Sequence, residues 1–136
     1  MKRLKKELEN RSGNELAALC SRAALDSKAE DLVVLDVRGI SSFTDYFVIM
    51  SGRSSRHVQG LAQAVEETMC AKRVSGKHSE GMDEGLWVLL DYEDVVVHIF
   101  SHDSRTFYDL EGLWHDAPRL DVQVLLADAD VAAPEA

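Results

Sequence analysis

The sequence predicts a single α/β domain in which helices sandwich a mixed β-sheet. Short β-rich runs alternate with segments of helical periodicity, and Gly- or Ser-containing turns separate them. The elements follow one another in the order α-β-β-α-β-β-α. A chain of 136 residues fits one domain that buries a core of its own, so stability requires neither a disulfide nor a metal.

The first helix is expected to begin at Ser12 and to end near Ala29. Ser12 and Glu15 have the spacing of a capping box, and small and apolar residues then recur at helical intervals. Residues 32–37 and 46–50 follow as two nearly continuous apolar runs. This pattern is typical of strands that are covered on both faces.

The central helix is predicted from Ser54 or Ser55 to about Arg73, because either serine can cap it and one face is apolar. The apolar positions of this face are Val58, Leu61, Ala62, Val65 and Met69. A loop is expected over residues 75–85.

A β-hairpin is predicted next, with strands over residues 86–91 and 95–100. The short segment Tyr92-Glu93-Asp94 between them has the length of a hairpin turn. If the strands at 46–50 and 86–91 are parallel, the central helix between them makes a right-handed crossover.

The last helix is expected from Ser101 or Asp103 to about Trp114, with Pro118 as a stop signal. One face of it carries Phe107, Leu110 and Trp114 at spacings of three and four.

The domain boundaries follow from these elements. A single domain is predicted over residues 12–118, after a flexible charged segment at 1–11. Residues 119–136 are expected to form an acidic, Ala-rich, disordered tail, although the apolar residues of 119–126 could add a short edge element.

Charge is divided unevenly along the chain, whose net charge is −9. Residues 1–79 hold 13 Lys/Arg and 10 Asp/Glu, whereas residues 80–136 hold 2 and 14. An acidic surface repels a phosphate backbone, so no direct readout of nucleic acid is expected. It favours a basic partner, or it serves solubility as a solvated face; charge does not choose between these two.

Cysteine usage and hydropathy point to a cytoplasmic protein. Cys20 and Cys70 lie in helical segments without a CxxC motif, as expected of two buried thiols. No apolar run approaches the ~20 residues of a membrane span, so no membrane partner is expected. The N-terminus lacks the apolar core of a signal peptide.

Motifs for metal binding and nucleophilic catalysis are absent from the sequence, and no metal or cofactor is expected. HExxH and Cys/His pairs at zinc spacing do not occur. His98 and His102 are four apart, but across a strand end and a cap, so their spacing implies no shared face. Ser101-His102-Asp103-Ser104 contains the residue types of a hydrolase triad without a GxSxG elbow, and we interpret it as a helix cap.

Two patterns keep a nucleotide-related function open. Gly52-Arg53-Ser54-Ser55-Arg56 could cradle a phosphate at a helix N-terminus, although a plain turn with a Ser cap is favoured. A strand, a Gly-Ser turn and a helix also open the nucleotidyltransferase fold, whose chemistry needs paired carboxylates. Asp91 and Glu93 have that spacing, but they lie at a hairpin turn without a second cluster. The alternative function is therefore a nucleotidyltransferase-like enzyme or a nucleotide-binding protein.

Four segments resemble, in the right order, the signature segments of the Iojap family of ribosomal silencing factors. They are residues 36–49, 51–58, 87–100 and 105–114. The resemblance extends from about residue 14 to 116. One departure is Glu93, where the family commonly has glycine. Because glycine adopts positive φ at little cost, either Glu93 carries a conformational cost or the turn differs.

The resemblance implies a nucleotidyltransferase-like fold without nucleotide transfer. It also implies that the chain binds the large ribosomal subunit through its fourteenth protein and blocks association with the small subunit. Translation would thereby be repressed when nutrients are short; some members of the family act in subunit maturation.

Aromatic residues in an acidic setting suit an interface with such a partner, since ribosomal proteins are commonly basic. The predicted contact residues are Trp87, Asp91, Tyr92, His98, Phe100, Arg105, Tyr108 and Trp114. The competing interpretation places the aromatic members of this set in the core. Family-motif residues without an assigned role are Ser54, Ser55, Arg56 and His57. A further hypothesis is a self-associating scaffold, such as a homodimer, that pairs strand edges.

Overall fold

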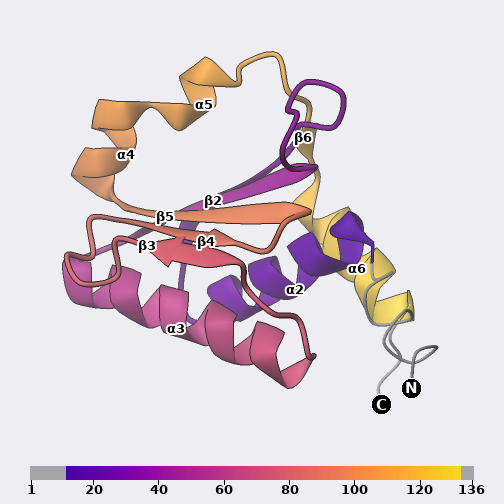
Figure 1. The fold of residues 1–136 in the computed structure, drawn as a ribbon, viewed down its shortest axis with the longest axis horizontal. Helices are drawn as coiled ribbons and strands as arrows, with labels where there is room; N and C mark the ends of the chain where they lie inside the picture. The colour runs from indigo at the N-terminus through magenta and orange to yellow at the C-terminus, as the bar shows by residue number, and fades with distance from the viewer. Residues whose placement is uncertain (1–11, 133–136) are drawn as a thin grey trace.

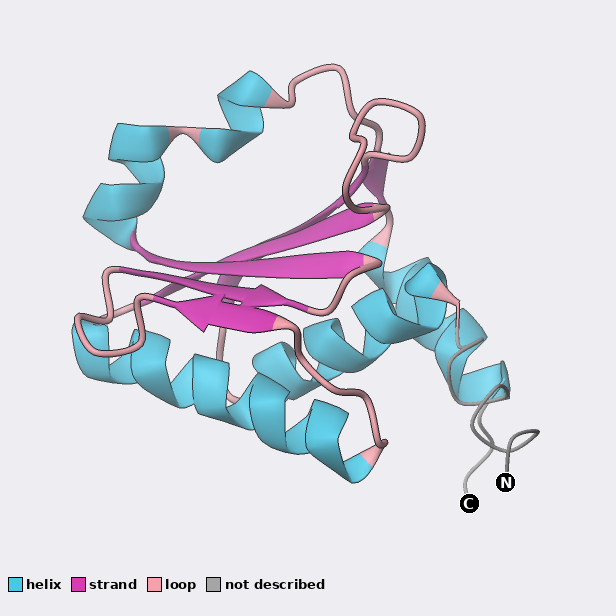
Figure 2. Cartoon of the chain, in the orientation of Figure 1, coloured by secondary structure: helices cyan, strands magenta, loops and turns pink. Residues whose placement is uncertain are grey.

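A computed structural model describes residues 12–132 as a mixed six-stranded sheet with helices on both faces (Figures 1 and 2). The strands are β1 (Glu30–Asp36), β2 (Tyr46–Gly52), β3 (His78–Glu80), β4 (Trp87–Asp91), β5 (Val95–Ser101) and β6 (Arg119–Leu120). The helices are α2 (Gly13–Asp26), α3 (Ser55–Ala71), α4 (His102–Tyr108), α5 (Leu110–Leu113) and α6 (Val122–Ala132). The predicted α/β class with a mixed sheet is confirmed.

The sheet has the strand order β3-β4-β5-β2-β1-β6. β2 and β5 pair in parallel, and every other neighbouring pair is antiparallel. The right-handed crossover that was expected if β2 and β4 were parallel therefore does not join these two strands. It joins β2 to β5, and β4 lies beyond β5 as its hairpin partner.

Helices α2 and α3, both predicted from the sequence, cover one face of the sheet together with α6 (Figure 1). The capping box of α2 is confirmed: Ser12 Oγ accepts a hydrogen bond from the Glu15 N–H, and the Glu15 side chain accepts one from the Ser12 N–H. The apolar face of α3 is also confirmed. Its fully buried residues are Val58, Leu61, Ala62, Val65 and Met69.

The opposite face of the sheet is covered by less structure, because among residues 12–132 the only helices over it are the short α4 and α5 (Figure 2). Alternating side chains of the strands form a second, smaller apolar cluster there. Its buried members are Leu35, Val37, Phe47, Ile49, Val96, Phe100 and Ala117. This thinly covered face contains the candidate functional site described below.

Two internal segments differ from expectation. The predicted loop at 75–85 contains β3, a short edge strand whose three residues are all exposed. The predicted last helix is interrupted at Asp109, which adopts the left-handed conformation (φ 46°, ψ 54°) and separates α4 from α5. The three residues of β3 are polar, so they gave no hydrophobic signal in the sequence, and the strand is defined by its pairing with β4.

The expectation of a disordered tail was wrong for residues 119–132, whereas the short edge element that residues 119–126 could add is present as β6. β6 pairs with β1, with Leu120 opposite Val34, and thereby becomes the outer strand of the sheet. In α6, Leu125 is buried against the core that α2 and α3 share. The side chain of Asp121 accepts hydrogen bonds from the N–H groups of Gln123 and Val124 and so caps this helix. The predictions for residues 1–11 and 133–136 lie outside the described residues.

The hairpin between β4 and β5 resolves the question raised by Glu93. Glu93 has a φ of 77°, so the turn does use the conformation that glycine adopts more easily. The Asp91 carboxylate compensates in part, since it accepts a 2.8 Å hydrogen bond from the Glu93 N–H.

The two cysteines differ in environment. Cys20 is buried and burial raises the pKa of its thiol to about 12, which keeps it protonated. Cys70 is exposed, so the expectation of two buried thiols was wrong for it. Within residues 12–132, no helix combines the length and the apolar character that a membrane crossing requires.

Candidate functional site

The candidate site is the sheet face beneath α4 and α5, where aromatic rings from distant parts of the chain meet. The Trp87 ring lies 4.9 Å from Phe100 and 4.7 Å from Tyr108, measured between ring centroids. Phe47 lies 5.2 Å from Trp114 in an edge-to-face arrangement. Strand alternation explains the gathering, because every second side chain of β2, β4 and β5 faces this side.

His98 is at the centre of this layer and is held as a neutral imidazole. Its Nδ1 accepts a 3.1 Å hydrogen bond from the Trp87 indole N–H, which leaves the ring proton on Nε2. Burial lowers the pKa of His98 to about 4, because the apolar surroundings disfavour the charged form. Its Nε2 has no hydrogen-bond partner among the described residues.

Three residues predicted to contact a partner are buried. Phe100 is fully buried, His98 is 4% exposed and Tyr92 is 6% exposed. Phe100 and His98 lie on β5, which is flanked by strands on both sides, and Tyr92 points into the core beneath α2 and α3. In this conformation none of the three can form a docking surface, and that part of the prediction was wrong.

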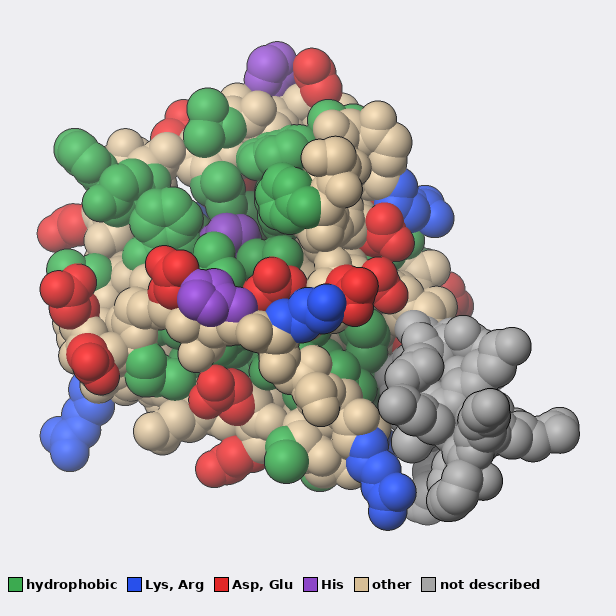
Figure 3. Space-filling model, viewed as in Figure 1, with side chains coloured by type: hydrophobic (Ala, Val, Ile, Leu, Met, Phe, Trp, Pro, Cys, Tyr) green, Lys and Arg blue, Asp and Glu red, His purple; other side chains and the backbone are tan. Residues whose placement is uncertain are grey.

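Other rings and aliphatic side chains are instead exposed on α4, α5 and a neighbouring loop. Phe107 is 79% exposed, Leu113 75%, Phe43 64% and Tyr108 48%. We call these four residues, together with the half-buried Trp87, the aromatic face. Figure 3 shows hydrophobic side chains gathered on this part of the surface.

Of the aromatic face, the sequence had indicated only Trp87 and Tyr108 as contacts. Phe107 shares a predicted helix face with Leu110 and Trp114, but the helix is interrupted at Asp109 and Phe107 is exposed. Leu110 and Trp114 of that predicted stripe do pack partly against the sheet. Phe43 and Leu113 carried one available signal, namely large apolar residues outside any predicted apolar stripe.

Acidic side chains border the aromatic face along β3 and the hairpin. Asp91 is two residues beyond Leu89 and four beyond Trp87 on β4, so it lies on the same side of the sheet. Glu80 is paired with Leu89 and faces the same way. In Figure 3 a row of acidic groups, with one histidine and one basic group among them, runs along this border.

Asp94, at the end of the hairpin, is partly buried beside two other carboxylates. Burial raises the pKa of Asp94, and the neighbouring carboxylates of Asp45 and Glu93 raise it further. A nearby cation would relieve this repulsion.

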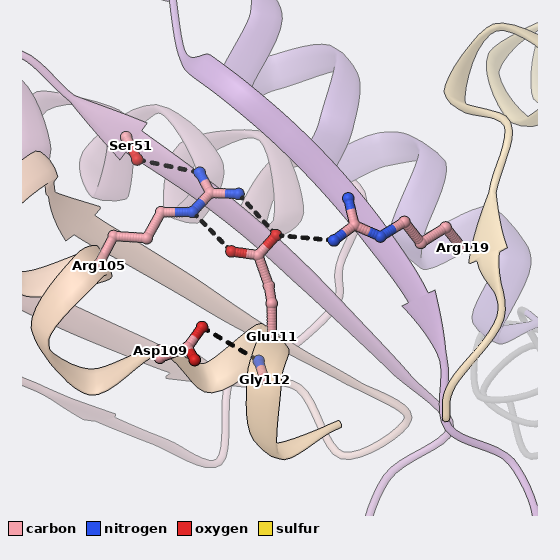
Figure 4. A network of polar contacts seen from close by, with 6 residues as sticks. All are labelled: Ser51, Arg105, Asp109, Glu111, Gly112 and Arg119. Carbon is pink, nitrogen blue, oxygen red and sulfur yellow. Dashed lines mark hydrogen bonds and ion pairs between the residues drawn. The ribbon is translucent and has the colours of Figure 1, made fainter. Parts of the chain in front are cut away.

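Arg105, also predicted to contact a partner, is engaged within the chain (Figure 4). Its Nε and Nη2 donate to the two carboxylate oxygens of Glu111 at 2.9 and 3.2 Å, and its Nη1 donates to Ser51 Oγ at 2.9 Å. Only 13% of its side chain is exposed.

The motif from Ser54 to His57 fastens the start of α3. Ser54 Oγ accepts a hydrogen bond from the His57 N–H, which confirms the serine cap. His57 Nδ1 accepts from the Arg53 N–H at 2.9 Å, so its Nε2 carries a proton and donates to Ser27 O at 3.0 Å. The turn thereby ties α3 to the segment after α2. Because the Arg53 N–H already donates to His57, this backbone donor is not available to bind a phosphate at the turn.

The residues weighed for catalysis are likewise engaged in structure. Ser101 Oγ accepts from the Ser104 N–H, which confirms the helix-cap interpretation. His102 contacts Glu30 at 2.6 Å. Among residues 12–132, no group of three or more His, Cys, Asp or Glu side chains could hold a metal ion.

Comparisons with known proteins agree with this architecture. The profile of the family described as "Ribosomal silencing factor during starvation" matches residues 10–136. The ribosomal silencing factor RsfS of Bacillus subtilis is 43% identical over 104 residues, which are 76% of this chain and 88% of the relative. The chloroplastic protein Iojap of Zea mays is 32% identical over 106 residues, which are 78% of this chain and 46% of that longer protein.

Solved structures match as well. A crystal structure from Chromobacterium violaceum has a TM-score of 0.75 and 35% identity, and the match covers 76% of this chain and 87% of that one. A crystal structure from Bacillus halodurans has a TM-score of 0.68 and 39% identity, covering 76% and 93% of the two chains. The chain therefore belongs to the RsfS family of ribosomal silencing factors, to which the Iojap proteins are similar.

Proposed function

We propose that this ribosomal silencing factor acts by docking in the cytoplasm. It binds the large ribosomal subunit through the subunit's fourteenth protein and sterically blocks the small subunit, which represses translation under nutrient limitation. The observation that carries this proposal is the aromatic face with its acidic border.

The aromatic face has the composition of a protein-binding surface. Aromatic side chains provide much of the affinity at interfaces, and here Phe107 and Leu113 expose three quarters or more of their surface to water. Burial of one such side chain against a partner contributes roughly 1.5–3 kcal/mol. The aromatic rings beneath these exposed side chains pack against one another and hold them in place.

The acidic border favours a basic protein over nucleic acid as the partner. Glu80, Asp91 and Asp94 would repel a phosphate backbone close to the aromatic face. Lys or Arg side chains of a partner would instead pair with these carboxylates and speed the encounter.

Binding explains the site better than nucleotide transfer does. Asp91, which that chemistry would need as a metal ligand, does not belong to any group of three or more His, Cys, Asp or Glu side chains that could hold a metal ion among residues 12–132. Calorimetry with nucleoside triphosphate and magnesium tests this alternative directly. Heat of binding that disappears in Ser54→Ala would support a nucleotide site and count against the docking proposal.

Co-sedimentation with isolated large subunits tests the docking proposal. Phe107→Ser is expected to weaken binding about tenfold or more, since the lost contact corresponds to at least ~1.4 kcal/mol. Val124→Ser is the matched control, because Val124 is 55% exposed on α6, outside the aromatic face. Equal binding by the two variants would contradict the assignment of the surface.

Charge reversal tests the acidic border separately. Asp91→Lys is expected to slow association and to make binding less sensitive to salt. Glu67→Lys on the exposed side of α3 has the same change in net charge and serves as its control. The same comparison with the purified fourteenth protein shows whether that protein alone accounts for the contact.

A further inference from the structure

Helices α4 and α5 carry three residues of the aromatic face, yet apolar packing alone does little to fix their position. Neither helix contains a fully buried residue. The apolar contacts come from the partly buried Leu110 and Trp114, which pack against the sheet, and from the half-exposed Tyr108, whose ring lies 4.7 Å from that of Trp87. Two helices of seven and four residues are also too short to be stable by themselves.

A network of polar contacts holds the two helices to each other and to the sheet (Figure 4). Arg105 on α4 makes a bidentate contact with the carboxylate of Glu111 on α5, and it also donates a hydrogen bond to Ser51 on β2. Glu111 Oε2 also accepts a hydrogen bond from Nη2 of Arg119, on β6, at 3.4 Å. The network therefore joins four separate elements.

The network sets the geometry of the bend between the helices. Asp109 adopts the left-handed conformation there, and its carboxylate accepts a hydrogen bond from the Gly112 N–H. The planar guanidinium of Arg105 can satisfy both Glu111 oxygens only in one relative orientation of α4 and α5. That orientation places Phe107 and Tyr108 on one side of the bend and Leu113 on the other.

The state of Glu111 is consistent with a strong contact. The hydrogen bonds from Arg105 lower the pKa of Glu111, and this effect is larger than the opposing effect of burial. Both side chains are largely shielded, with 13% and 20% exposed, so solvent screens the pair less than a surface pair.

We infer that Arg105 is a positioning residue for docking: through Glu111 and Ser51 it holds α4 and α5 in the arrangement that presents the aromatic face. It does so without contacting the partner. The inference deepens the proposed function and rests on it, because it assumes that the aromatic face is the surface that docks.

Charge alone predicts the opposite effect of removing Arg105, which makes the inference testable. Arg105→Gln makes the surface more negative, and a basic partner would then be attracted more strongly. If Arg105 positions the helices, the same change weakens binding, because the partner must first order α4 and α5.

The test measures affinity for isolated large subunits in a double-mutant cycle of Arg105→Gln and Phe107→Ser, with Arg73→Gln as control. Arg73 is exposed after the end of α3, away from α4 and α5. We expect Arg105→Gln to weaken binding about fivefold or more and Arg73→Gln to leave it unchanged. In the Phe107→Ser background the loss from Arg105→Gln should shrink, because one of the three residues that Arg105 positions is gone. Full additivity, or unchanged affinity of Arg105→Gln, would overturn the inference.

Two further measurements keep the test decisive. Arg105→Lys preserves the charge but not the two-pronged contact, so it should lose affinity in the same direction if Arg105→Gln does not fold. Amide hydrogen exchange of residues 102–114 in the free protein should accelerate in Arg105→Gln and not in Arg73→Gln. If the unaltered protein fails to bind large subunits, the proposed function fails, whereas unaltered exchange in Arg105→Gln refutes the positioning role itself.

Discussion

Acidification is expected to destabilise the fold through His98. The pKa of His98 is lowered by burial from 6.5 to about 4, so between these values the unfolded chain binds a proton that the folded chain does not. The free energy of unfolding is unaffected by this group above pH 6.5 and falls as the pH decreases toward 4. One pKa unit corresponds to about 1.4 kcal/mol, so the full loss is about 3 kcal/mol.

Chemical denaturation at pH 7.5 and 5.0 measures this effect, and His98→Phe isolates it. Phenylalanine keeps a ring that can stack on Phe100, whose ring lies 12° from the plane of His98. It also removes the acceptor for the Trp87 indole, but that cost is the same at both pH values and cancels in the difference. The unaltered protein should lose about 2 kcal/mol more than the variant between the two pH values. Equal losses would refute the reasoning that His98 is buried in the neutral form.

Three substitutions test local features of the fold by the free energy of unfolding. Glu93→Gly should stabilise the protein by about 0.5–1 kcal/mol, because Glu93 has a φ of 77°. The control Glu67→Gly, within α3, should destabilise it. If Glu93→Gly does not stabilise the protein, the assigned conformation of the turn is contradicted. Ser54→Ala should cost about 1 kcal/mol through loss of the α3 cap, and an unchanged midpoint would show that the cap is dispensable. Gly85→Ala should cost about 1–3 kcal/mol, because Gly85 has a φ of 66° and an added Cβ would lie 2.6 Å from Ser55 O; a neutral result would mean that the turn relaxes freely.

Periodicity in the sequence was sufficient for the elements that bury a regular stripe. The α3 face and the capping box of α2 depend on residues three and four apart, so local sequence determines them. The central strands β2 and β5 were visible as continuous apolar runs because sheet neighbours and helices cover them.

Elements that depend on long-range pairing were harder to predict. β6 is two residues long and exists because it pairs with β1, more than eighty residues earlier in the chain. Arg105, close to the break at Asp109, contacts Glu111 and also Ser51, and Ser51 lies 54 residues earlier in the chain, so the sequence does not show that these side chains meet.

For the candidate site, composition identified the right region but not the orientation of its side chains. Trp87, Asp91 and Tyr108 lie on or beside the aromatic face, whereas Phe100 and Tyr92 of the same hairpin are buried. Hairpin residues alternate between two faces, and both faces of this sheet are apolar near β5, so the sequence could not show which face remained open.

Subunit joining measures the central claim most directly. Isolated small and large subunits are mixed with increasing amounts of the protein, and the fraction of joined ribosomes is determined by sedimentation. We expect the joined fraction to fall with the unaltered protein and with Val124→Ser, and to be largely restored with Phe107→Ser. Unimpeded joining at saturating protein, or equal inhibition by Phe107→Ser, would contradict docking through the aromatic face as the means of silencing.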